Sequence, residues 1–151
     1  MAIRNLVKDP DPMLRKISRP IEKFDDRLHT LVEDMIDTMN EANGVGLAGV
    51  QVGILRRIFV IDVGEGPQEF INPEIIEKSG SQTDSEGCLS FPGLYGEVTR
   101  AMKVKVTAYD RFGNKFTKEY EGLGARAVQH ENDHLDGKAF VDIAKNLEKN
   151  D

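Results

Sequence analysis

Two histidines four residues apart, His130 and His134, constrain this chain more than any other feature of its sequence. On an α-helix this spacing separates two side chains by about 40° and one turn, so both imidazoles can reach one metal ion. Glu131 completes an HExxH pattern, in which the glutamate handles the protons of a water that the ion activates. The alternative is an amphipathic helix on which two histidines share a face by chance. With three histidines in the whole chain, the pattern favours a metal-dependent hydrolase.

A catalytic metal site of this kind usually has three protein ligands and an open position for water. Downstream of His134 the chain offers Asp136, Asp142 and Glu148 as carboxylates, but no further histidine. Upstream lies the only cysteine, Cys88, whose thiolate is a strong ligand for zinc or ferrous iron. We therefore expect Cys88 to complete the ligand set.

A lone cysteine is also a common core residue, so Cys88 has a second interpretation as a small buried apolar side chain. Its neighbours favour the ligand role. Gly87 allows the backbone to approach another element, and Pro92 and Gly93 are expected to close the segment as a loop. One thiolate with two neutral imidazoles would leave a divalent ion with net positive charge, able to acidify a water.

An amphipathic helix is predicted near the N terminus, over residues 26–42, with Asp25 or Asp26 as its cap and Gly44 as its stop. Its apolar residues recur at helical spacing. They are Leu28, Leu31, Val32, Met35, Ile36 and Met39.

Gly44, Gly46 and Gly49 spell the GxGxxG pattern of dinucleotide-binding proteins. That pattern has physical meaning only after a strand and at the start of a helix. Here a helix is predicted before it and a strand after it. We therefore exclude a nucleotide site.

Several segments are predicted as strands from their β-branched and aromatic residues and from the turn residues between them. They are Arg57–Ile61, Gln68–Asn72, Ile75–Lys78, Met102–Tyr109 and Lys115–Glu121. A helix over residues 122–135 carries the two histidines. Because strands and helices do not alternate, we expect an α+β fold in which antiparallel β-sheets surround the central HExxH helix. No repeat or linker divides the chain, so residues 1–151 are expected to form a single metallohydrolase domain.

The composition, 39% hydrophobic and 30% charged, suits one soluble domain with one substantial core. The net charge of −6 argues against direct nucleic-acid binding. Met1–Arg4 lacks the apolar run of a signal peptide, and no stretch approaches the length of a membrane span, so no membrane partner is expected. A single cysteine excludes internal disulfides, which fits a reducing, cytoplasmic location.

Three short motifs follow one another along the chain: GVGLAGVQ at 44–51, EGCLS at 86–90 and QHENDHL at 129–135. Together they resemble the motifs of the peptide deformylases, enzymes that remove the formyl group from the amino terminus of newly made proteins. The motifs span most of the chain. Two positions depart from the family's usual pattern, because Gly49 stands where alanine is common and Val50 where proline or threonine is often found.

The resemblance implies a role for each motif. A divalent ion would be held by Cys88, His130 and His134, and Glu131 would move protons between the attacking water and the leaving amine. The side-chain amide of Gln51 and the backbone N–H of Leu89 would stabilise the charge that develops on the formyl oxygen.

The resemblance also implies a cleft for the first methionine of the substrate. Its residues would be Gly44, Gly46, Glu86, Gly87, Leu123, Arg126 and Ala127. Gly46 would lend backbone groups to an extended peptide. The aliphatic stem of Arg126 would line the cleft while its guanidinium stays in water, and Glu86 is expected to pair with Arg100.

The ligand set accepts zinc, nickel, cobalt or iron, and the resemblance implies Fe2+ in the cell. The implied partners are the formylated N termini of nascent peptides, with a transient contact to the ribosome if a local patch allows it. Two other functions stay open. A zincin-like metalloprotease would need a downstream ligand, and a non-catalytic metal-stabilised binding module would have no use for Glu131 and Gln51.

Overall fold

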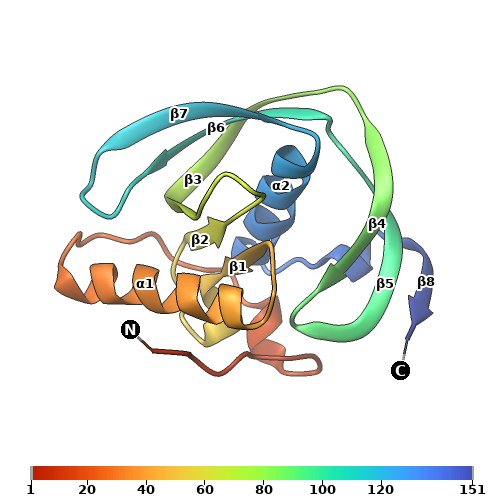
Figure 1. The fold of residues 1–151 in the computed structure, drawn as a ribbon, viewed down its shortest axis with the longest axis horizontal. Coiled ribbons are helices and arrows are strands. Elements are labelled where there is room, and N and C mark those ends of the chain that lie inside the picture. The colour runs from red at the N-terminus through yellow and green to blue at the C-terminus, as the bar shows by residue number, and fades with distance from the viewer. Residues whose placement is uncertain (1, 151) are drawn as a thin grey trace.

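Residues 2–150, which the computed structural model describes, form helices and strands in an α+β arrangement (Figure 1). The two α-helices are α1 (Asp26–Glu41) and α2 (Leu123–Leu135). The strands are β1 (Gly46–Ala48), β2 (Ile58–Ile61), β3 (Gln68–Ser79), β4 (Gln82–Cys88), β5 (Phe91–Arg100), β6 (Lys103–Tyr109), β7 (Lys115–Glu121) and β8 (Lys145–Lys149). Three short 3-10 helices are η1 (Pro12–Arg15), η2 (Gly49–Val52) and η3 (Phe140–Asp142). Within residues 2–150 no helix is long and apolar enough to cross a membrane.

The strands form two antiparallel sheets. The larger sheet has the order β1-β2-β3-β6-β7 and the smaller one the order β4-β5-β8. The prediction of an α+β fold with antiparallel sheets is therefore confirmed.

One long hairpin joins the two sheets. β3 pairs with β6 in the larger sheet, and their continuations β4 and β5 pair with each other in the smaller sheet. The chain bends between them at Gly80, whose φ of 70° lies in the left-handed region that glycine adopts at no steric cost. Cys88 pairs with Phe91, so the tip of this bent hairpin carries the only cysteine (Figure 1).

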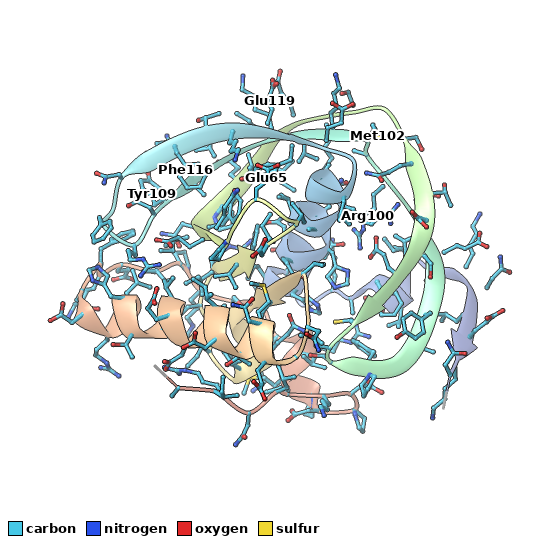
Figure 2. All side chains as sticks on the ribbon, in the orientation of Figure 1. Glu65, Arg100, Met102, Tyr109, Phe116 and Glu119 are labelled. Carbon is cyan, nitrogen blue, oxygen red and sulfur yellow. The ribbon has the colours of Figure 1, made fainter. Side chains whose placement is uncertain are left out.

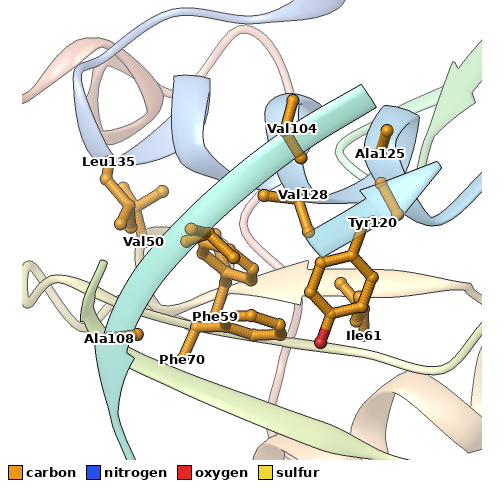
Figure 3. Close-up of a cluster of buried hydrophobic side chains, with 13 residues drawn as sticks. Val50, Phe59, Ile61, Phe70, Val104, Ala108, Tyr120, Ala125, Val128 and Leu135 are labelled. Carbon is orange, nitrogen blue, oxygen red and sulfur yellow. The ribbon is translucent and has the colours of Figure 1, made fainter. Parts of the chain in front are cut away.

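The strand β2 is buried on both faces. Its side chains alternate between two apolar clusters, as the two-residue period of a strand requires. Ile58 and Val60 pack with the residues of α1, whereas Phe59 and Ile61 pack with Val128 and other residues of α2 (Figure 3). The larger sheet is thereby fixed between the two helices.

The helix α1 matches the segment predicted over residues 26–42 to within one residue. The side chain of Asp25 accepts a hydrogen bond of 3.1 Å from the backbone N–H of Leu28, which confirms Asp25 as the N-cap. Six of its residues are buried, among them Val32, Met35 and Met39. The apolar periodicity therefore identified both the helix and its packed face.

Two predictions about the strands were wrong. Gln68–Asn72 and Ile75–Lys78 belong to one strand, because Asn72 takes a φ of 51° and the register shifts past Pro73 without ending the pairing. The loop expected at Pro92 and Gly93 is instead part of β5. The polar residues of β4 concealed this hairpin, since most of them are exposed and show no apolar alternation.

Candidate metal centre and substrate cleft

The helix α2 presents two different faces. Ala125, Val128 and Leu135 belong to the apolar cluster beneath the larger sheet. His130 and His134 are also buried, and both lie close to Cys88 at the tip of the bent hairpin. Apolar packing on one face of α2 therefore fixes where the polar groups on the other face lie.

Cys88, His130 and His134 converge. One ligand atom from each lies within 4.8 Å of the other two, and Cys88 Sγ is 3.4 Å from His134 Nε2. The two imidazole rings are 5.2 Å apart, centre to centre. Ligands about 2.0–2.3 Å from a tetrahedral ion lie roughly 3.5 Å from one another, so this spacing suits one small cation.

The carboxylate of Glu86 lies behind the first histidine and is surrounded by donors. Its Oε1 is 2.8 Å from His130 Nδ1 and 2.9 Å from Arg100 Nη2, while Arg100 Nε is 2.6 Å from Oε2. Burial opposes ionisation, but His130 and Arg100 outweigh it and lower the pKa of Glu86 to about 2. The carboxylate therefore accepts the Nδ1 hydrogen of His130, which turns Nε2 of that ring toward Cys88 and His134.

The guanidinium of Arg126 was expected to lie in water, but it is buried. Its side chain is 7% exposed, and its guanidinium donates to Glu86 Oε2 and to the carbonyl of Val98. A buried carboxylate needs compensating charge, and Arg126 supplies it together with Arg100. The predicted pairing of Glu86 with Arg100 is confirmed.

A chain of charges extends from this carboxylate to the surface. Arg100 Nη1 donates to Asp133 Oδ2 at 3.0 Å, and the side chain of Asp133 is 31% exposed. Figure 2 shows Arg100 between α2 and the β4–β5 hairpin. Helix and hairpin are therefore joined by ion pairs next to the point where Cys88 meets the histidines.

The electrostatic environment favours a cation between the three donor residues. Burial alone would lower the pKa of His130, but Glu131, Cys88 and Glu86 outweigh it and raise that pKa to about 10. Burial, followed by the charge of His130, lowers the pKa of His134 well below its usual range, so this ring is neutral and can act as a ligand. Nδ1 of His134 is buried and has no hydrogen-bond partner among residues 2–150. The residues thus fit a bound divalent ion in donor type, spacing and charge.

Glu131 lies against Gly46 of β1. A Cβ at position 46 would lie 2.9 Å from both Cγ and Cδ of Glu131, closer than side chains pack, so any larger residue there would require this carboxyl group to shift. Glu131 is buried, and its Oε1 has no hydrogen-bond partner in the described part of the chain. Burial is the main cause that raises the pKa of Glu131 to about 7, where a group both accepts and releases protons near neutral pH.

Gln51 approaches the centre from η2. Its Oε1 accepts from the N–H of Ala48 at 2.9 Å, and its Nε2 lies 3.5 Å from Cys88 Sγ. Leu89 follows Cys88 in the turn between β4 and β5 and lines the same cleft. The two predicted oxyanion donors therefore lie on the side of the centre where Cys88 lies.

A cleft of about 590 Å3 opens over the centre. Its walls contain twelve of the thirteen predicted site residues: Gly44, Gly46, Gln51, Glu86, Gly87, Cys88, Leu89, Leu123, Arg126, Ala127, His130 and Glu131. His134 is 1% exposed and lies behind them. The sequence prediction therefore named residues that the fold brings together, whatever role each one has.

The downstream carboxylates are engaged elsewhere. Asp136 pairs with Arg57 at 3.0 Å and Asp142 with Arg15 at 2.7 Å, while Glu148 lies on the exposed strand β8. Among residues 2–150 the group of potential metal ligands comprises Cys88 and the two histidines of α2. The third histidine, His29, contacts the carbonyl of Arg111 at 3.0 Å. These contacts leave Cys88 as the third candidate ligand.

Sequence reasoning assigned no role to several residues of this site. Leu6, Lys8 and Tyr95 line the cleft, and Ser90 contacts Gln51 from the turn of the bent hairpin. Ser90 belongs to the EGCLS motif, and this membership was the signal that could have identified it. The N-terminal residues carry no periodic pattern that could have indicated their contacts with the cleft.

Comparison with known proteins identifies the family. A model of the polypeptide deformylase family matches residues 3–150. The chain is 58% identical over 144 residues to peptide deformylase 1 of Clostridium perfringens, covering 94% of this chain and 98% of that one. It is 59% identical to the peptide deformylase of Caldicellulosiruptor bescii, with 94% and 86% of the two chains covered.

Solved structures agree with these relatives. The crystal structure of peptide deformylase from Thermotoga maritima superposes with a TM-score of 0.93 at 44% identity, covering 95% of this chain and 98% of the other. That of Ehrlichia chaffeensis peptide deformylase in complex with actinonin gives a TM-score of 0.94 at 37% identity, covering 97% and 91%. The chain belongs to the polypeptide deformylase family and is an enzyme.

Proposed function

We propose that this deformylase holds one divalent metal ion on Cys88, His130 and His134, and that the ion and Glu131 together remove the formyl group from formylmethionyl N termini, releasing formate. The observation that carries the proposal is the convergence of one thiol and two imidazoles within 4.8 Å, beside a buried carboxyl group and at the base of a cleft. In this proposal the HExxH helix α2 is the functional centre around which the sheets are arranged.

The bound ion would act as a Lewis acid and would lower the pKa of a water molecule. Glu131 is the proposed proton carrier. Its carboxylate takes a proton from the water that attacks the formyl carbon and later gives that proton to the amine that leaves. A pKa of about 7 suits both directions of transfer, because neither protonation state is strongly favoured at neutral pH.

Negative charge develops on the formyl oxygen during the attack. We assign its stabilisation to the side-chain amide of Gln51 and the backbone N–H of Leu89, which approach the centre from η2 and from the β4–β5 turn. Donors that are already oriented in a water-poor site stabilise such charge without reorganising. Gln51 is 1% exposed, which supports such an environment.

The proposed substrate lies along the cleft with its methionine side chain against Leu123 and Ala127. Leu123 is 54% exposed and lines the cleft, so its apolar side chain is accessible to a substrate. Gly44, Gly46 and Gly87 keep the walls low enough for an extended backbone. Glu86 and Arg126 contribute to the wall while they bind each other, so their charges are compensated without the substrate.

The donor set supports iron, zinc, nickel or cobalt, and we propose Fe2+ as the ion in the cell. Residues 1–151 are proposed to act as a single metallohydrolase domain in the cytoplasm. Formylated N termini of nascent peptides are the proposed partners, and transient contact with the ribosome stays a prediction.

The test is formate release from a formylmethionyl tripeptide, with metal content measured on the same sample. Glu131→Gln should retain the metal and lose at least ~10²-fold in kcat, since general acid–base catalysis contributes about that much or more. Cys88→Ala should instead lose the metal. Full turnover by Glu131→Gln, or unchanged metal affinity in Cys88→Ala, would contradict the assigned roles.

A further inference from the structure

Ser90 lies in the turn between β4 and β5, and its side chain is fully buried next to Gln51. Its Oγ donates to the carbonyl of Val7 at 2.7 Å and lies 3.0 Å from Gln51 Nε2. A serine hydroxyl has one hydrogen. Because that hydrogen is given to Val7, Ser90 Oγ can only accept from the amide of Gln51.

The other end of the same amide is fixed as well. Gln51 Oε1 accepts from the N–H of Ala48 at 2.9 Å. A rotation by 180° would set the NH2 group against the N–H of Ala48, and the carbonyl oxygen against the lone pairs of Ser90. Both ends would then lose a buried hydrogen bond, each of which is costly to leave unmade. The Gln51 amide therefore has one stable orientation.

This orientation determines where the second hydrogen of Nε2 points. One hydrogen is bound to Ser90, and Cys88 Sγ lies 3.5 Å from Nε2 on the side of the metal centre. The second hydrogen is directed at Cys88 Sγ and so faces the metal centre, beside which a formyl oxygen would lie. The backbone fixes the arrangement further, since the N–H of Val7 donates to the carbonyl of Gln51 at 2.7 Å and the N–H of Asp9 to the carbonyl of Ser90 at 2.8 Å.

We propose that Ser90 is a positioning residue for deformylation, whose hydroxyl holds the Gln51 amide with one N–H directed at the developing charge on the formyl oxygen. The inference rests on the proposed role of Gln51 as an oxyanion donor. Charge on that oxygen develops in the transition state and not in the bound substrate, so a misplaced amide lowers kcat and leaves KM nearly unchanged.

The test compares Ser90→Ala in two backgrounds, using the metal-loaded full chain and a formylmethionyl tripeptide. Removing an oxyanion donor outright costs about 10²–10³ in kcat, and a donor that is free to rotate should lose part of that, roughly tenfold. We expect KM and metal content within about twofold of the parent protein. In a Gln51→Met background, Ser90→Ala should have no further effect on kcat. An equal loss in both backgrounds, or a change in KM alone, would overturn the proposal.

Thr38→Val is the matched control. The hydroxyl of Thr38 is also buried, accepts from the N–H of Arg4 at 2.9 Å and donates to the carbonyl of Asp34 at 2.7 Å. It therefore secures the same N-terminal segment, but does so away from the cleft. We expect Thr38→Val to lower thermal stability while kcat stays within about twofold. Ser90→Thr, which keeps the hydroxyl, should recover most of the activity that Ser90→Ala loses.

A measurement without substrate tests the same orientation in the parent protein. The side-chain amide hydrogens of Gln51, followed by NMR, should exchange with solvent at least ~10-fold more slowly than those of the exposed Asn40. Equally fast exchange would overturn the inference even if Ser90→Ala does not fold. The two possible failures are distinguishable, because an unchanged kcat in Gln51→Met alone contradicts the proposed role of Gln51, whereas equal losses in both backgrounds contradict only the role of Ser90.

Discussion

Apolar packing holds α2 against the larger sheet, whereas buried charges and a small apolar cluster hold the tip of the bent hairpin. On the first side, Phe59 and Phe70 stack with ring centres 4.7 Å apart and pack in the cluster that contains Val128 of α2 (Figure 3). On the second side, Glu86 of β4 binds Arg126 of α2 and Arg100 of β5. The proposed ligands come from both sides, since α2 supplies the histidines and the hairpin supplies Cys88.

The two sides should respond differently to substitution. Close packing resists any change of volume, so the apolar face of α2 should be sensitive to the size of the core side chains. Ion pairs depend on every partner being present, because a buried charge that loses its partner is strongly destabilising. We therefore expect substitutions in the core of the larger sheet to lower stability and leave metal affinity unchanged, and substitutions among the charges around the hairpin to lower metal affinity as well.

The largest expected effect is on the apolar side. Phe70→Ala should lower the free energy of unfolding by about 3–5 kcal/mol, because a fully buried ring leaves a cavity. Phe91→Ala, on the hairpin side, removes a ring that packs edge-on against Phe140 in the smaller cluster, and should cost less. Urea unfolding at a fixed metal concentration measures both. A greater loss for Phe91→Ala would reverse the comparison.

Gly46→Ala tests the contact between β1 of the larger sheet and Glu131, the proposed proton carrier. The new methyl group would displace Glu131, and a shift of about 1 Å in a reacting group can cost roughly 10²-fold in rate. We expect kcat to fall by about that factor while the metal stoichiometry is unchanged. Turnover within fivefold of the parent would show that Glu131 can move without consequence.

Arg126→Met tests the charged side. Glu86 would keep Arg100 and His130 but lose one of its cations, and changes behind a ligand typically weaken metal binding by 10–100-fold. We expect a loss near the lower limit, about tenfold, in competition with a chelator. Arg111→Met is the control, because Arg111 binds Glu69 and Glu33 away from the cleft, and its loss should leave metal affinity within twofold. Equal effects of the two variants would contradict the proposed division.

The smallest expected effect concerns a single carboxylate on α1. Burial would raise the pKa of Asp34, but hydrogen bonds from the N–H of Ala2 and from Arg4 outweigh it and lower that pKa. A lowered carboxyl pKa contributes stability that is present above the unfolded value of about 3.9 and is lost as pH falls through the folded value. Asp34→Asn should therefore cost about 1 kcal/mol at pH 6.

The same difference should shrink as the pH falls below 3.9, which thermal unfolding of both proteins across pH can follow. Asp37→Asn, on the same helix, is the control, because no hydrogen bond of its side chain is found among residues 2–150. Its effect should stay within about 0.5 kcal/mol at every pH. A constant difference between Asp34→Asn and the parent protein would exclude ionisation as the cause.

The apolar side could be predicted from the sequence, and the charged side largely could not. Helical periodicity identified α1, and a short apolar run identified Ile58–Ile61 as buried. The strand β4 was missed because Gln82–Ser85 are polar and mostly exposed, so its pairing depends on β5 and not on a pattern of its own.

The candidate site divides in the same way. Residue type and helical spacing indicated His130 and Glu131 without any structure. The environment of Arg126 could not be predicted, because the carboxylate it binds lies on a different strand and only the fold brings the two together. The contact between Ser90 and Gln51 could not be predicted either, because the sequence around Ser90 does not indicate which amide its hydroxyl binds.

The bend at Gly80 also has a consequence for chain entropy. The chain leaves the larger sheet through β4, reaches Cys88 at the tip of the hairpin and returns through β5. Cys88 is therefore remote from His130 along the chain, although their side chains meet. An unfolded chain would have to close that long loop before both residues could bind one ion, so the ion should bind the folded chain far more tightly and thereby stabilise it. Metal loading should therefore raise the melting temperature as well as enable turnover, and a chelator should reverse the two together.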